Sequence, residues 1–369
     1  MALDPSNAVV HLSMRRGEHE LSVGTGILYS RNGKVFIVTA WHNLSGRHAI
    51  TMKPISSVLA FPDTVVATVS CRTDLNGKTY GYSRLPFTIP LEVNDTPTYL
   101  VHAQAFPRVD VAAIPFDVGI PYQIEMQVSN GGVAKMTWLP RGPISANGMT
   151  SDVECIQDVE SSYAQPQSFP DLWLGDDLFI MGYPRALSDL FGQPLWKRAT
   201  VASSPQSGTR VKHFLVDCAS REGMSGAPVV SYNRTGLTMN GGAIQVGTPT
   251  TIFHGIYTSR VGKADLFEAQ IGTVWQRTAA DEIIDAGVPA SPSESLEAYA
   301  SEIEAVIEQS WHTDAGFAEK MVEWEAPREY FLQSVMEALH GRADPSDVRE
   351  RILDAARRKL GALSAKQAS

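Results

Sequence analysis

Cysteine is scarce in this chain of 369 residues. The three cysteines, Cys71, Cys155 and Cys218, are odd in number and far apart, which fits neither a disulfide framework nor the paired spacing of a zinc site. Long apolar runs are lacking too, and the N-terminus has neither the basic nor the apolar segment of a secretion signal. We therefore expect a cytoplasmic protein that neither crosses nor binds a membrane.

Basic charge is not in excess. The chain holds 31 Lys and Arg residues against 40 Asp and Glu residues, which gives a net charge of −9. The acidic surplus lies near the C-terminal end, because residues 281–369 contain 18 of the acidic and 9 of the basic side chains. A surface that neutralises phosphates needs surplus Lys and Arg, so we do not expect nucleic acid as a partner.

Short strand-like runs fill the first part of the sequence, separated by Gly, Pro, Asn and Ser. The Asn32-Gly33 pair between two β-rich runs predicts a two-residue hairpin, since both turn positions must accept a positive φ. The other runs are 9–12, 65–69, 99–103, 109–116, 178–181, 214–217, 228–231 and 251–258. This spacing, without helical periodicity in between, predicts a mainly β fold built as a sandwich or a pair of barrels.

Helical periodicity replaces this pattern from about residue 278. Apolar residues recur at intervals of three and four over 296–311 and again over 331–339. Asp344 and Pro345 have the residue types of an N-cap and a first helical position, and so predict the start of a third helix. We therefore expect a β domain over 1–278 and a small α-helical domain over 279–369.

Three segments of the predicted β domain carry the groups that acyl transfer needs. In chain order these segments contain His42, then Asp110, then Ser225. An imidazole can take the proton of a serine hydroxyl, and a carboxylate can hold that imidazole in the right tautomer. Backbone N–H groups can then stabilise the oxyanion, and Gly223, two residues before Ser225, permits the tight backbone that would present them.

These segments resemble the trypsin-like (chymotrypsin-fold) serine proteases, particularly the disulfide-free bacterial branch that includes HtrA and the glutamyl endopeptidases. The segments at 24–26, 175–184 and 254–258 add to the resemblance, each in the family's order. It implies two antiparallel six-stranded-type β-barrels followed by the helical domain. The first barrel is expected over about 8–117, an insertion over 118–174 and the second barrel over 175–275.

The resemblance also implies a role for each residue. His42 is expected to be the general base, Asp110 the group that orients it, and Ser225 the nucleophile. The N–H groups of Gly223 and Ser225 are expected to form the oxyanion hole. Asp117 is the nearest rival to Asp110, but it follows the strand end and fits a turn residue better.

The substrate pocket is inferred from the same resemblance. The residues expected to line it are Ala219, Ile256, Tyr257, Thr258 and Ser259. Ala219 stands where trypsin-type enzymes carry an acid for Arg or Lys, and Tyr257 stands where glutamyl enzymes carry a histidine. We therefore expect an uncharged residue at the P1 position of the substrate, with Arg221 and Arg260 as the nearby cations that argue against this expectation.

The sequence thus predicts an intracellular serine endopeptidase that acts on protein or peptide substrates and needs no cofactor or metal. A catalytically silent scaffold that binds peptides along 251–258 is the alternative. Met224 occupies the position where relatives activated by N-terminal cleavage carry an acid. Control is therefore expected from the helical tail or from a protein that binds it, and a bacterial defence system is one setting for such an effector.

Overall fold

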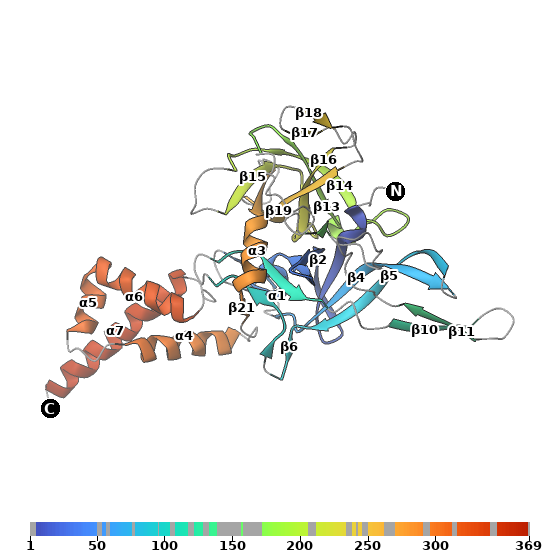
Figure 1. Ribbon diagram of the computed structural model, residues 1–369. Coiled ribbons are helices and arrows are strands. Elements are labelled where there is room, and N and C mark those ends of the chain that lie inside the picture. Colours follow the sequence, from blue (N-terminus) through green and yellow to red (C-terminus); the bar gives the residue numbers. More distant parts are fainter. Residues whose placement is uncertain are drawn as a thin grey trace.

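The computed structural model describes most of the chain. The described ranges are 5–49, 54–56, 60–75, 78–94, 96–103, 108–116, 122–127, 133–138, 156–157, 172–205, 212–233, 238–240, 243–245, 250–261, 270–290, 296–311, 316–339 and 345–367. Within them the chain forms a β body with a group of helices to one side of it (Figure 1).

Among the described residues, the N-terminal half of the body forms a nine-stranded sheet. The strand order is β21-β8-β9-β3-β2-β1-β4-β5, and β12 pairs in parallel with β2. The strands are β1 (Val9–Arg16), β2 (His19–Arg31), β3 (Lys34–Thr39), β4 (Thr64–Leu75), β5 (Lys78–Pro90), β8 (Leu100–Val101), β9 (Ala112–Pro115), β12 (Ile156–Gln157) and β21 (Val288–Pro289). A short helix η1 (Pro5–Ala8) precedes β1, and α1 (Trp41–Ser45) follows β3.

The hairpin predicted at Asn32-Gly33 is confirmed. It joins β2 to β3, with Arg31 paired to Lys34 across the turn. Asn32 and Gly33 have φ angles of 53° and 72°, which is the left-handed conformation that a two-residue turn between twisted strands requires. The hairpin places the end of β3, where the His42 segment begins, in the centre of the sheet.

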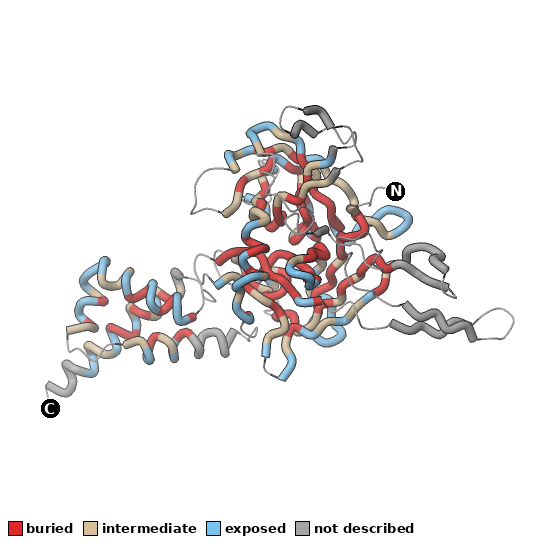
Figure 2. The backbone as a smooth tube through the Cα atoms, viewed as in Figure 1, coloured by how far each residue is buried: buried red, intermediate tan, exposed pale blue. Residues whose placement is uncertain are grey.

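The second half of the body is a closed six-stranded barrel with the order β13-β14-β15-β20-β19-β16. Its strands are β13 (Asp177–Gly182), β14 (Leu195–Val201), β15 (His213–Asp217), β16 (Ala227–Asn233), β19 (Thr250–Arg260) and β20 (Ile271–Gln276). Inward-facing side chains such as Leu178, Val216 and Val229 fill its interior, and Figure 2 shows this buried centre in red. The mainly β architecture expected from the sequence is therefore confirmed.

Shorter elements decorate the two β units. In the part of the chain that the structure describes, three two-stranded ribbons and the short helix η2 (Pro184–Ala186) lie outside the main sheets. The ribbon strands are β6 (Glu92–Val93) with β7 (Thr96–Pro97), β10 (Tyr122–Gln127) with β11 (Val133–Trp138), and β17 (Thr238–Asn240) with β18 (Ala243–Gln245).

Helix α3 (Arg277–Ala286) packs on the β body. Its residues Ala279, Ala280 and Ile283 are buried in the core between the sheet and the barrel. Downstream of α3, β21 pairs with β8 at the edge of the sheet. The domain boundary predicted after residue 278 therefore falls inside α3, and these contacts join residues 279–290 to the β body.

The remaining helices share a separate apolar core. They are α4 (Leu296–Ser310), α5 (Phe317–Glu323), α6 (Glu325–Ala338) and α7 (Pro345–Gln367). Ile303 of α4, Val335 of α6 and Ile352 of α7 are fully buried in this core. The three helices expected from the apolar spacing correspond to α4, α6 and α7, and α7 begins at Pro345 as its residue type predicts.

The apolarity of the helices and the state of the cysteines can be compared with the expectations from the sequence. Within the described part of the chain, no helix is long and apolar enough to cross a membrane. Cys71 and Cys218 are buried and are not joined in a disulfide, whereas Cys155 lies outside the described residues.

Candidate active site

Helix α1 positions His42 directly after the central strand β3. Ala40 is extended and precedes the helix, and Gly46 ends it after five residues with a left-handed φ of 66°. Trp41 is buried, and the guanidinium carbon of Arg108 lies 5.2 Å from the centre of its ring. This cation–π contact links α1 to the segment that carries Asp110.

His42 and Asp110 are in direct contact. The Nδ1 atom of His42 lies 2.9 Å and 3.0 Å from the two carboxylate oxygens, and the backbone N–H of His42 donates to Asp110 Oδ1 at 3.0 Å. Asp110 is buried and the His42 side chain is largely buried. This geometry places the proton on Nδ1 and leaves Nε2 as the basic nitrogen.

The carboxylate of Asp110 favours the protonated form of the His42 imidazole. Burial by itself lowers the pKa of His42, but the charge of Asp110 and its hydrogen bond outweigh burial, so the pKa is raised above its ordinary value. A raised pKa makes the imidazole a stronger base and stabilises the imidazolium ion that forms when it takes a proton.

The loop around Ser225 depends on two glycines. Gly223 and Gly226 both have a φ of 89°. A Cβ atom on Gly223 would lie 2.3 Å from the carbonyl oxygen of Tyr183, and one on Gly226 would lie 1.9 Å from that of Thr25. The backbone therefore turns tightly at both positions and packs against two other segments, as only glycine allows.

The backbone hydrogen bonds of this loop leave two donors available. The carbonyl groups from Glu222 to Ser225 all accept hydrogen bonds, and the N–H groups of Met224 and Gly226 donate to Arg221 and Tyr257. Among the described residues, the N–H groups of Gly223 and Ser225 have no hydrogen-bond partner. Gly223 is buried and Ser225 is half-buried. Nearly all buried backbone donors are paired in proteins, and two unpaired donors two residues apart can together bind an anionic or partly anionic oxygen.

Thr25 of β2 and Asn43 of α1 hold the loop in this conformation. Thr25 Oγ1 donates to the Gly223 carbonyl at 2.7 Å, and Thr25 N donates to the Ser225 carbonyl at 2.8 Å. Asn43 Nδ2 donates to the same Ser225 carbonyl at 2.9 Å and to Thr39 Oγ1 at 3.0 Å. These contacts of Thr25 and Asn43 are not expected from the sequence, although both residues stand inside the Gly-Thr-Gly and His42 segments of the resemblance.

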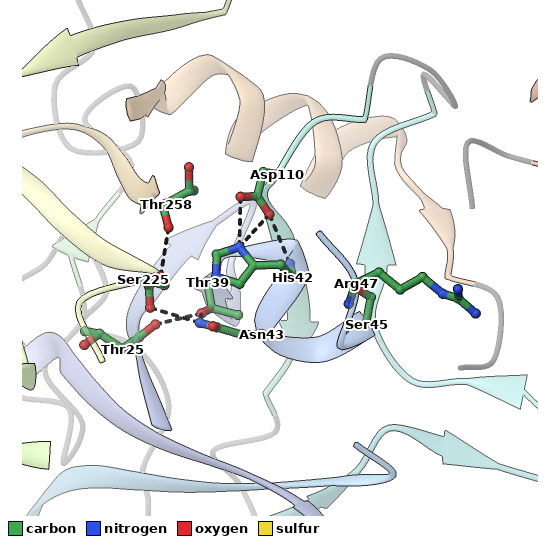
Figure 3. Close-up of polar contacts among 9 residues, drawn as sticks. All are labelled: Thr25, Thr39, His42, Asn43, Ser45, Arg47, Asp110, Ser225 and Thr258. Atoms are coloured by element: carbon green, nitrogen blue, oxygen red, sulfur yellow. Dashed lines mark hydrogen bonds and ion pairs between the residues drawn. The ribbon is translucent and has the colours of Figure 1, made fainter. Parts of the chain in front are cut away.

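The Ser225 hydroxyl is directed to a different acceptor from the one expected. Its Oγ donates to the carbonyl oxygen of Thr258 at 2.8 Å. Figure 3 shows the imidazole of His42 between Asp110 and Ser225. Among the described contacts there is no hydrogen bond between Ser225 Oγ and His42.

The residues predicted to form the substrate pocket differ in accessibility. Ile256 lies in the core between the two β units and Tyr257 in the barrel core, and both are buried. Thr258 is also buried, Ala219 is half-buried and Ser259 is exposed. The hydroxyl of Tyr257 contacts the hydroxyl of Ser220, next to Ala219.

Asp117 lies outside the described residues. His254 contacts Ser231 Oγ at 2.9 Å, and burial lowers its pKa to about 4. Within the described residues, no group of three or more His, Cys, Asp and Glu side chains is placed to hold a metal ion.

Comparisons with known proteins give no family. No protein-family model matches the chain, and no curated protein matches it in sequence. Among solved structures, the chain is similar to a serine endoprotease from Yersinia pestis, with 14% identity and a TM-score of 0.37 over 77% of this chain and 65% of that one. The chain thus spans just under two thirds of the Yersinia protein.

Two other similar structures are bacterial or extremophile proteases. One is the thermostable serine protease AL20 from an extremophilic microorganism, with 13% identity and a TM-score of 0.35 over 75% of this chain and 95% of that one. The other is the protease Anisep from Arthrobacter nicotinovorans, with 14% identity and a TM-score of 0.35 over 76% and 97%. At these values the likenesses assign neither a family nor an activity to this chain.

Proposed function

We propose that this protein is a serine endopeptidase in which Ser225 attacks the substrate, His42 is the general base and Asp110 orients His42. The observation that carries the proposal is the pairing of two features in one site. A histidine is held by a buried carboxylate, and a serine loop presents two N–H groups without partners among the described residues. Acyl transfer is the reaction class that uses both features together.

The first half of the reaction forms an acyl-enzyme. Ser225 leaves its contact with the Thr258 carbonyl by rotating about its single side-chain torsion to another staggered position, toward His42. His42 Nε2 takes the hydroxyl proton as Oγ bonds to the substrate carbonyl carbon. The oxygen becomes an oxyanion that accepts hydrogen bonds from Gly223 N–H and Ser225 N–H. His42 then gives the proton to the departing amine as the C–N bond breaks.

The second half regenerates the serine. A water molecule gives a proton to His42 Nε2 and attacks the acyl carbon, and the new oxyanion occupies the same two N–H groups. When the bond to Oγ breaks, His42 returns the proton to Ser225 and the acid product leaves. Throughout, Asp110 accepts from His42 Nδ1 and stabilises the imidazolium without taking its proton.

Cleavage of a peptide mixture by the full chain tests the proposal. The full chain should cleave peptide bonds in a proteome-derived peptide mixture, with cleavages identified by mass spectrometry. A Ser225→Ala variant purified in parallel should give none of these cleavages. If both proteins gave the same cleavages, a contaminating protease would be their source and the proposal would fail.

One observation favours the silent peptide-binding scaffold as a second candidate. The Ser225 hydroxyl is hydrogen-bonded to the Thr258 carbonyl rather than to His42. If this contact persists when a peptide binds, the nucleophile is never activated. Binding of library peptides by the wild type without any cleavage would identify this second function.

We also propose that helices α4 to α7 form a module that controls the site or binds a partner. These helices bury their apolar faces in a core of their own. Ion pairs such as Arg351 with Glu304 and Lys359 with Glu308 link α7 to α4. A unit with its own core can fold by itself. Residues 296–367 hold 14 acidic and 9 basic side chains, an acidic excess suited to a basic partner.

Two truncated chains test whether the β body folds and works without helices α4 to α7. A chain ending after residue 290 keeps α3 and β21 with the β body, and it should remain folded and retain peptidase activity. A chain ending after residue 278 loses Ala279, Ala280 and Ile283 from the core between the sheet and the barrel, and it should unfold or aggregate. Loss of folding in the longer truncation would show that α4 to α7 belong to the body.

A further inference from the structure

An exposed apolar tip stands on the loop between β13 and β14. We call this segment, residues 184–193, the Leu190 loop. Leu190 keeps 99% of its surface accessible, Phe191 keeps 83% and Leu187 keeps 58%. In Figures 1 and 2 the loop projects from the body beside the N-terminal end, and its outer part is exposed. Leu190 and Phe191 lie in the turn that Asp189 and Gln193 close, and Leu187 precedes this turn. Large exposed apolar side chains close together on one loop are typical of a surface that binds something.

The Leu190 loop is held in one conformation. Asp189 Oδ1 accepts hydrogen bonds from the N–H groups of Phe191 and Gln193, both at 2.8 Å. Gly192 N donates to the Asp189 carbonyl, and Tyr183 Oη donates to the Gly192 carbonyl. Because the turn is already ordered, binding an apolar partner at its tip costs little conformational entropy.

The base of the loop touches the proposed oxyanion hole. Arg185 N donates to the Glu222 carbonyl at 2.7 Å, which fixes the peptide unit that carries the N–H of Gly223. Arg185 and Ala186 both have left-handed φ angles, 52° and 58°. Two successive non-glycine residues in this region are strained, and such strain is typical of functional sites.

The loop therefore lies on one side of the nucleophile. Residues 183–185 contact Glu222 and Gly223, whereas the Ser225 hydroxyl contacts Thr258 of β19. From Arg185 to Leu190 the chain can span at most about 18 Å. A substrate whose carbonyl lies on the two free N–H groups thus reaches the apolar tip within roughly five residues of the scissile bond.

We propose that the Leu190 loop binds an apolar stretch of the substrate polypeptide, within about five residues of the scissile bond and on one side only. The inference rests on the proposed protease function and extends it to a substrate class. Leu190 and Phe191 are the contacting residues. The substrates are polypeptides that expose apolar side chains, such as unfolded or locally opened proteins.

The size and charge of the Leu190 loop favour a substrate segment over a second copy of this chain or a membrane. Three side chains offer far less than the roughly 800 Å² per partner that a stable dimer buries, so the tip suits a short linear segment better than a second copy. Binding to an anionic membrane needs a cluster of basic residues. The loop instead carries one arginine, Arg185, and one aspartate, Asp189.

The experiment compares the full-length wild type with the double variant L190S/F191S. Two readouts are taken from each protein, the rate of labelling by a small fluorophosphonate and the cleavage profile in a proteome-derived peptide library. A double variant W173S/L174S is the matched control, because it removes two adjacent exposed apolar residues, 64% and 63% accessible, that precede β13, whereas the Leu190 loop follows it. Light scattering and sedimentation with phosphatidylserine vesicles test the other occupants.

We expect all three proteins to be labelled at rates within about twofold. The wild type and the control should cleave peptides with apolar residues enriched on one side of the cut. In L190S/F191S this enrichment should disappear, and kcat/KM for the preferred peptides should fall about 5- to 20-fold through loss of apolar burial.

Other outcomes overturn the inference in distinguishable ways. Equal labelling with the same cleavage profile in L190S/F191S and wild type overturns the role of the loop and leaves the protease function standing. No labelling and no cleavage by the wild type overturns both. A wild type that dimerises or sediments with vesicles, and loses either property in L190S/F191S, assigns the tip to a second copy or to a membrane instead.

Discussion

The site has a base side, formed by His42 and Asp110, and a nucleophile side, formed by the loop that carries Ser225. Different kinds of contact fix the two sides. On the base side, side chains are already engaged, because His42 Nδ1 contacts both carboxylate oxygens of Asp110. On the nucleophile side the backbone is prepared instead. The carbonyls around Ser225 are tied down by Thr25, Asn43 and Arg185, while the hydroxyl of Ser225 contacts Thr258.

This difference shows which groups the fold must hold in place before a substrate binds. Oxyanion stabilisation depends on donors that do not reorganise during the reaction, and the anchored carbonyls keep the N–H groups of Gly223 and Ser225 from turning away. The Ser225 hydroxyl sits on a single torsion and moves between staggered positions on a fast timescale. We therefore expect the base pair and the loop backbone to be rigid and the hydroxyl to be the moving part.

The largest expected effect comes from removing either reacting group. Ser225→Ala and His42→Ala should each lower kcat by on the order of 10⁴-fold or more, because the proton transfer and the attack are one event. The double variant should be little slower than either single variant. Additive losses in kcat would mean that the two sides act independently, contrary to this account.

Asp110→Asn should have the next largest effect, on the order of 10⁴-fold in kcat. Because Asp110 raises the pKa of His42, the wild-type kcat/KM should fall as the pH drops through a value above 6.5, where His42 becomes protonated. In Asp110→Asn, burial acts without the opposing charge, so the inflection should move to lower pH.

A pH profile of kcat/KM measures this shift. Asp177→Asn is the control, because that carboxylate pairs with Arg198 on an exposed surface. An inflection at the same pH in wild type and Asp110→Asn would contradict the assignment of Asp110 as the orienting group.

Thr25→Val tests the preparation of the nucleophile side. The substitution keeps the shape but removes the donor to the Gly223 carbonyl and the acceptor for Tyr183 N. The loosened loop should cost about 10- to 100-fold in kcat with KM nearly unchanged, since the oxyanion donors act mainly in the transition state. Thr200→Val in β14 is the isosteric control, and an equal loss of kcat there would point to general destabilisation.

Asn43→Ala should have the smallest effect of the series. The Ser225 carbonyl that Asn43 contacts also accepts from Thr25 N, so one of its two hydrogen bonds remains. We expect kcat to fall by about 3- to 10-fold, in line with the loss of one hydrogen bond. A thermal melt should be recorded alongside the kinetics, and a kcat loss larger than that of Thr25→Val would make Asn43, rather than Thr25, the principal anchor of the loop.

Local patterns within the site can be predicted from the sequence, whereas contacts between distant segments cannot. The sequence singles out His42, Asp110 and the Gly223–Ser225 turn because each sits in a short local pattern with a chemical reason. The roles of Thr25 and Asn43 were not found, because they act across separations of 198 and 182 residues. Only the folded chain brings such distant groups together.

The end of the body was hard to predict for a related reason. The apolar stripe of α3 fits helical packing on any neighbour, so its sequence does not say whether Ile283 faces the β body or the later helices. The hairpin at Asn32-Gly33 was predictable because its turn depends on two adjacent residues. Local determinants were therefore readable from the sequence, and the choice of packing partner was not.

The most direct test of the central claim is the mass of the protein after reaction with a fluorophosphonate, with the modified residue located by peptide sequencing in the mass spectrometer. The account predicts one adduct per chain on Ser225, formed at least 10³-fold more slowly in His42→Ala, as expected when the general base is removed. No adduct, an adduct on another residue, or equal rates in wild type and His42→Ala would contradict the claim that His42 activates Ser225.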